Sequence, residues 1–95
     1  MKKPPTDRFE SVWDAIADTR EEAANLRVRS ELMDEIFELI VANGWTQVEA
    51  AAQCGLTQPR ISDLLRGRIS RFSLDALVNI AVAFGQRVHV ALAAA

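Results

Sequence analysis

Four glycines divide the chain, and each directly follows a stretch whose apolar residues recur at helical spacing: Gly44, Gly55, Gly67 and Gly85. Glycine adopts the left-handed backbone conformation that commonly ends a helix, without the steric cost that a side chain would bring. We therefore predict a helix end at each glycine. A chain of 95 residues divided in this way is expected to fold as helices around one small core.

Hydroxyl side chains mark the starts of the same helices: Thr19, Thr46, Thr57 and Ser73. Such side chains accept hydrogen bonds from the free N–H groups of a first helical turn. Glu22 and Glu49 follow the first two caps by three residues, which completes the reciprocal capping box. The two ends of each helix are therefore specified locally.

Together these signals predict helices over residues 20–43, 47–53, 58–66 and 74–84, within a domain of residues 19–85. Ser30 can also cap a helix, so the first segment is either one helix or two with a break near Arg29. A short amphipathic helix is expected over residues 7–17, inside an N-terminal segment of residues 1–18. The total is about five helices.

A change of period marks the C-terminal segment, residues 86–95. Val88, Val90 and Leu92 alternate with Arg87, His89 and Ala91 and share one face, as in a β-strand. No other segment of the sequence predicts a strand, so the main-chain groups of this one need a partner outside the chain. We expect the same strand of a second copy, paired antiparallel about a twofold axis. The alternative is a frayed tail.

The composition argues against an enzyme. The chain has one cysteine, Cys54, and one histidine, His89, so neither a metal-ligand cluster nor a nucleophile with its base is easily assembled. We expect no catalytic residue, metal or cofactor. The sequence has no recognisable signal peptide and no apolar run long enough to span a membrane, which favours a cytoplasmic protein without membrane contact.

The charges are divided along the chain. Residues 1–45 hold ten acidic and six basic side chains, whereas residues 46–95 hold three acidic and five basic ones. Four of the five basic residues lie close together: Arg60, Arg66, Arg68 and Arg71. A chain with a net charge of −2 can therefore still present one positive face.

The two short helices over residues 47–53 and 58–66 are joined by the segment Cys54-Gly55-Leu56. Helices of this length are unstable alone in water, so they must pack on each other and on flanking helices. Their expected interior residues are Val48, Ala51, Ala52, Leu56, Ile61, Leu64 and Leu65. The arrangement predicts a helix-turn-helix pair.

Polar and basic side chains crowd the starts of both short helices, the outer face of the second and the segment after it: Gln47, Thr57, Gln58, Arg60, Ser62, Asp63, Arg66 and Arg68. Arginine can bind guanine and glutamine can bind adenine through two hydrogen bonds, and helix N-termini and arginines contact phosphates. We therefore expect a surface that binds double-stranded DNA. The alternative is a purely structural helical bundle with a solvated polar face.

The same residues resemble a known family. TQVEAAA over residues 46–52 and GLTQPRISDLLRG over residues 55–67 resemble the helix-turn-helix of the XRE family, the group of the phage repressors. A longer span, which includes RFSLDAL over residues 71–77 and the terminal strand, is similar to the HigA-like antitoxin branch of that family. The resemblance covers almost the whole chain.

The resemblance implies an all-α, lambda-repressor-like helix-turn-helix bundle of about five helices with a C-terminal dimerising β-strand. It also implies a homodimer that binds an operator and represses transcription. Many relatives of this branch are autoregulating antitoxins with a RelE/HigB-like toxin encoded beside them. The alternative is a free-standing XRE-type regulator without a toxin partner.

The resemblance also places four residues on the DNA-binding face: Gln47, Gln58, Arg60 and Ser62. The two glutamines fall on positions that commonly contact bases or phosphates, and Thr57 caps the recognition helix. Asp63 departs from this picture because it puts a negative charge near the face. It either reads a cytosine or orients Arg60 or Arg66, and the sequence leaves this open.

Overall fold

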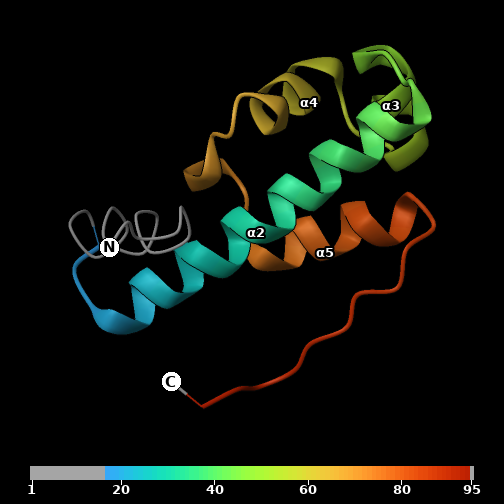
Figure 1. The fold of residues 1–95 in the computed structure, drawn as a ribbon. Helices are drawn as coiled ribbons and strands as arrows, with labels where there is room; N and C mark the ends of the chain where they lie inside the picture. Colours follow the sequence, from blue (N-terminus) through green and yellow to red (C-terminus); the bar gives the residue numbers. More distant parts are fainter. Residues whose placement is uncertain (1–16, 95) are drawn as a thin grey trace, which may run out of the picture.

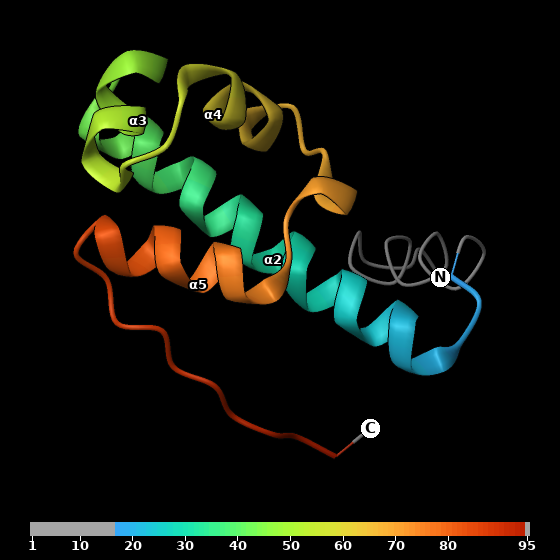
Figure 2. The ribbon, with the colours of Figure 1, turned by 180° about the vertical axis from the view of Figure 1, so that it is seen from behind.

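The computed structural model describes residues 17–94, which form four α-helices, one 3₁₀-helix and an extended C-terminal segment (Figure 1). The elements are α2 (Arg20–Asn43), α3 (Gln47–Cys54), α4 (Gln58–Leu65), the 3₁₀-helix η1 (Ile69–Arg71) and α5 (Leu74–Ala83). In both views α2 lies between α5 on one side and the pair of α3 and α4 on the other (Figures 1 and 2). All but the last of the residues expected to form a helix over 7–17 lie outside the described part of the chain.

The four predicted N-caps are present, although only one of the two predicted capping boxes is complete, since the Glu22 side chain does not return the bond to Thr19. Thr19, Thr57 and Ser73 each accept a hydrogen bond from the backbone N–H three residues later, at 3.0, 3.3 and 3.1 Å. Thr46 forms the complete capping box: its hydroxyl accepts from the Glu49 N–H at 3.2 Å, and the Glu49 carboxylate accepts from the Thr46 N–H at 2.8 Å. The starts of all four described α-helices are therefore fixed by local hydrogen bonds.

α2 is one continuous helix, so Ser30 does not begin a second one. Its buried residues are spaced along its whole length: Ala23, Leu26, Met33, Ile36 and Ile40. This apolar face continues on both sides of Arg29, and packing on the core keeps the helix unbroken. Gly44 ends α2 with a φ of 66°, and its N–H donates to the carbonyls of Ile40 and Val41.

The core lies where α2, α4 and α5 meet. Its largest fully buried side chains are Phe72, Ile36, Ile61, Leu64 and Leu77. Burial of side chains of this size stabilises a fold by about 1.5–3 kcal/mol each. At one end of the core the rings of Trp45 and Phe84 pack with their centroids 5.0 Å apart. The aromatic residues thus bind the loop after α2 to the end of α5.

The strand expected within residues 86–95 is not formed in the single chain. Residues 86–94 are extended but have no regular secondary structure, and they run back along the helices in the direction opposite to α5 (Figures 1 and 2). Val88 is half-buried, whereas Val90 and Leu92 are 79% and 99% exposed. A strand needs a neighbouring edge to pair with, and residues 17–94 contain no other strand. The regular structure of residues 17–94 is therefore all-helical, and the predicted β-strand is not formed there.

Arg29 joins α2 to the segment that precedes α5. Its Nη1 donates to the carbonyl oxygen of Phe72 at 3.0 Å and to that of Ile69 at 3.4 Å. The Ile69 carbonyl also accepts from the Phe72 N–H at 3.2 Å within the 3₁₀ turn, so Arg29 adds a second donor there and a side-chain donor at Phe72. The guanidinium therefore fixes η1 and Phe72 against the long helix.

Replacing Arg29 with Met keeps much of the apolar stem and removes both hydrogen bonds. We expect the free energy of unfolding to fall by about 1–2 kcal/mol, because partly buried carbonyls lose a charged donor. Urea denaturation followed by circular dichroism measures this change. The matched variant Arg66→Met, at an exposed position, is expected to change it by less than about 0.5 kcal/mol. A loss for Arg29→Met no greater than that of the control would contradict the structural role.

Candidate nucleic-acid interface

A tight turn of Gly55, Leu56 and Thr57 joins α3 to α4, and the two helices pack against each other. Gly55 has a φ of 70°, and the Leu56 N–H donates to the Ala51 carbonyl at 3.0 Å. Ala50 is completely buried in the same cluster as Ile61 of α4. A methyl side chain at this position lets α3 lie close to its neighbours. The predicted helix-turn-helix pair is therefore formed.

Fewer side chains are buried in the interior of the helix pair than the sequence predicts. Ile61 and Leu64 are buried, and Leu56 and Leu65 are partly buried, as expected. Val48 is instead 60% exposed, and Ala52 is exposed as well. The reason is that α3 has only two turns and meets the core along the edge formed by two adjacent alanines, residues 50 and 51.

Most of the expected DNA-binding residues lie on α4 or at its ends. Gln58, Ser62 and Arg66 follow each other at intervals of four residues, so they lie along one side of the helix. Gln58 and Arg66 are exposed, and Ser62 is partly buried. Thr57 caps α4, while Gln47 begins α3 and is partly buried. This side of α4 offers amide, hydroxyl and guanidinium groups together.

Arg60 is placed differently from its neighbours on α4. The Cζ atom of its guanidinium lies 4.0 Å from the centroid of the Phe72 ring, which is 1% exposed. This is the geometry of a cation–π contact, and it covers the face of a core aromatic ring. The Arg60 side chain therefore holds α4 against Phe72, which lies just before the N-cap of α5.

Asp63 pairs with two arginines that lie beyond α4. Its Oδ2 accepts a hydrogen bond from Arg71 Nη1 at 3.2 Å, and its Oδ1 lies 3.8 Å from Arg68 Nε. Among the described residues, the partners of Asp63 are thus Arg71 and Arg68, and not Arg60 or Arg66 as the sequence suggested. The sequence does not place Arg71 at the site, because its approach to α4 depends on how η1 folds back and no sequence spacing reveals that.

The electrostatic character of the surface changes between α2 and α4. From residue 30 to residue 59 the chain has no Lys, Arg or His, but it has five acidic side chains: Glu31, Asp34, Glu35, Glu38 and Glu49. The segment from Arg60 to Arg71 has four arginines and one acid. Because a polyanion binds where positive charge is concentrated, the face of α4 and η1 is the candidate for nucleic acid.

Other kinds of site find little support in residues 17–94. They contain no group of three or more His, Cys, Asp or Glu side chains that could hold a metal ion. Cys54 donates from its Sγ to the Ala50 carbonyl at 3.3 Å, and burial raises the pKa of its thiol. It is therefore a protonated packing residue at neutral pH. No helix in this part of the chain is both long enough and apolar enough to cross a membrane.

Comparison with protein families agrees with this geometry. A family model described as a helix-turn-helix domain matches residues 15–93, which is most of the chain. The chain belongs to the helix-turn-helix domain family. A helix-turn-helix domain binds DNA by placing the second helix of the pair in the major groove, and α4 is that helix here. No curated protein matches the chain.

Two substitutions on the second helix of this helix-turn-helix domain distinguish a residue that stabilises α4, Arg60, from one expected to contact bases, Gln58. Arg60→Ala is expected to lower the free energy of unfolding by about 0.5–2 kcal/mol, because the cation–π contact is lost. Gln58→Ala, at an exposed position, should leave it within about 0.5 kcal/mol. Thermal denaturation of both variants measures the difference.

Gln58 is expected to contribute more to DNA affinity than to the stability of the fold. Gln58→Ala should weaken binding to the best duplex selected from a random-sequence pool by about 1–3 kcal/mol, with much less effect on a scrambled duplex. Fluorescence anisotropy titrations measure both affinities. Equal losses on the two duplexes would remove Gln58 from base reading.

Proposed function

We propose that the protein is a sequence-specific transcriptional repressor that binds double-stranded DNA as a homodimer. The observation that carries the proposal is the positive face of α4 and η1, where exposed polar and basic side chains stand on a helix-turn-helix pair. On this proposal the protein binds its target and has no catalytic activity of its own.

Each part of the face has its own role in the proposed complex. Gln58, exposed at the first position of α4, and Ser62, one turn later on the same side, read base edges in the major groove. Arg66, Arg68 and Gln47 contact phosphates and set the register of the helix. Arg60 stabilises the orientation of α4 through its cation–π contact with Phe72. A dimer bound over a promoter then represses by excluding the polymerase.

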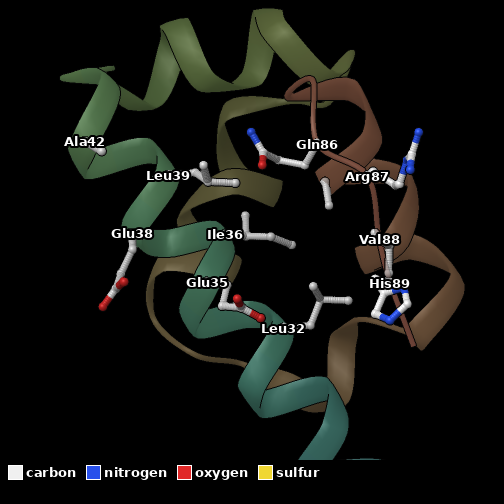
Figure 3. A pocket seen from close by; sticks show the side chains of 11 residues that line it. Leu32, Glu35, Ile36, Glu38, Leu39, Ala42, Gln86, Arg87, Val88 and His89 are labelled. Carbon is white, nitrogen blue, oxygen red and sulfur yellow. The ribbon is translucent and has the colours of Figure 1, made fainter. Parts of the chain in front are cut away.

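The C-terminal segment supports the dimer. A hollow of about 540 Å³ lies between this segment and α2, and Leu32 and Leu39 face Val88 across it (Figure 3). Val90 and Leu92, farther along, are almost fully exposed. An antiparallel strand from a second copy would pair with the main chain of residues 87–92 and cover these apolar side chains together. The segment is extended already, so pairing requires little rearrangement.

We further propose that this repressor is the antitoxin of a RelE/HigB-like toxin and that it represses the transcription of its own gene. Support comes from the likeness to the HigA-like branch and from the absence of basic side chains in residues 30–59, where four acids lie within residues 31–38 and complement a basic RNA-cleaving partner. The alternative is a free-standing regulator, in which these acids form only a solvated helix surface. The neighbouring reading frame distinguishes the two, since an antitoxin requires a small basic protein encoded beside it.

A twofold dimer predicts a twofold operator. Footprinting across the region upstream of its own gene should show two half-sites of inverted sequence, with centres about 10 base pairs apart or a multiple of that distance. This spacing follows because each recognition helix enters a major groove on the same side of the duplex. Protection of one asymmetric site without an inverted repeat would contradict the twofold arrangement.

The dimer itself is tested by breaking the proposed strand. Val90→Pro removes a main-chain donor from the middle of the segment, so we expect a monomer with its helix content retained. Operator binding should fall by much more than one side-chain contact is worth, because the second recognition helix must then be recruited from solution. Analytical ultracentrifugation measures the mass, and Ala93→Pro, outside the expected strand, serves as the control. A Val90→Pro dimer as stable as the control would refute the interface.

A further inference from the structure

The carboxylate of Asp63 occupies an unexpected place, because it lies on the face that is to meet the phosphates of DNA. A negative charge there repels the polyanion and weakens binding to every sequence equally. Its side chain is nevertheless well sheltered, at 21% exposed, and it lies between two arginines that are 42% and 53% exposed. The contacts of these arginines indicate what the carboxylate does.

Each arginine meets Asp63 with only part of its guanidinium. Arg68 directs Nε toward Oδ1, and Arg71 directs Nη1 toward Oδ2. A guanidinium has five N–H donors, so most of them stay available for a second acceptor on the outer side. Each arginine can therefore hold Asp63 and a phosphate oxygen at the same time.

The backbone that carries these arginines is fixed without the Asp63 side chain. The Arg68 N–H donates to the Asp63 carbonyl at 3.1 Å, and the Arg71 N–H donates to the Arg68 carbonyl at 3.0 Å. On the opposite side Arg29 holds the carbonyls of Ile69 and Phe72. The carboxylate therefore acts on the arginine side chains and leaves the course of the chain to other bonds.

We propose that Asp63 is a specificity-determining positioning residue, which holds the guanidinium groups of Arg68 and Arg71 in one arrangement on the DNA-binding face. The inference rests on the proposed function, in which this face docks on DNA. Arginines held in this way reach two phosphates together when α4 sits in its correct register. On other sequences or registers the arginines, held by Asp63, cannot follow the phosphate backbone freely. Asp63 thereby lowers binding to random DNA more than binding to the operator.

The test compares Asp63→Asn with wild type on two duplexes. One is the best duplex selected by the wild-type protein from a random-sequence pool, and the other is its scrambled counterpart. We expect the ratio of the two affinities to fall about fivefold, as exposed charge pairs of this kind allow. For the scrambled duplex, the slope of log K against log salt should steepen by roughly one contact, because the released arginines find phosphates freely.

The matched control is Asp34→Asn, which removes the same charge from an exposed position on α2. It should leave the ratio of affinities unchanged. In a chain that carries both Arg68→Ala and Arg71→Ala, Asp63→Asn should have no further effect on the ratio, since its partners are gone. A purely structural effect of Asp63 would persist in that background.

Each outcome separates the inference from the function on which it rests. If Asp63→Asn keeps the full wild-type ratio, Asp63 does not determine specificity, while DNA recognition by α4 stands. If the wild-type protein itself prefers no duplex, the proposed function fails. Should Asp63→Asn not fold, Arg71→Ala provides the second test: its side chain is 53% exposed, and its loss must lower both the affinity ratio and the salt slope on the selected duplex. An unchanged ratio and slope would overturn the inference.

Discussion

The ring of Phe72 is buried in the core, and its carbonyl oxygen accepts a hydrogen bond from Arg29, so one residue connects α2 with the segment before α5. The face of the same ring carries the guanidinium of Arg60, which brings α4 into the same contact. The short helix α4 depends on tertiary packing, and this contact adds to the burial of Ile61 and Leu64 in holding its orientation. The position of the positive face of α4 and η1 therefore depends on how the Phe72 ring packs in the core.

The signals that were local in sequence predicted the fold well. Thr46 and Gly55 define α3 by a capping box at one end and a left-handed residue at the other, and both need only neighbours within a few positions. The continuity of α2 at Ser30 could not be predicted, because a cap-forming residue inside a helix is overruled only by tertiary packing. The exposure of Val48 escaped prediction for the same reason.

The surface was predictable in its composition and less so in its contacts. The residue types on α4 indicated a DNA-binding helix, and the family match agrees with that interpretation. The contact of Arg60 with Phe72 and the pairing of Asp63 with Arg71 join residues 12 and 8 positions apart around a change of chain direction. Such pairs depend on the path of η1. The strand at residues 87–92 failed in one chain because alternation gives only a tendency, and a ladder needs a second edge.

The short recognition helix has a consequence for how this domain can be controlled. Eight residues between Thr57 and Arg66 persist as a helix only while Ile61 and Leu64 stay in the core. The helix α4 and the folded core therefore form one cooperative unit, with no well-populated state in which the core is intact and the helix is absent. An effector cannot melt α4 without unfolding the domain. Under the proposed function, control therefore comes from outside the fold, by covering the surface of α4 or by changing how many copies bind the DNA together.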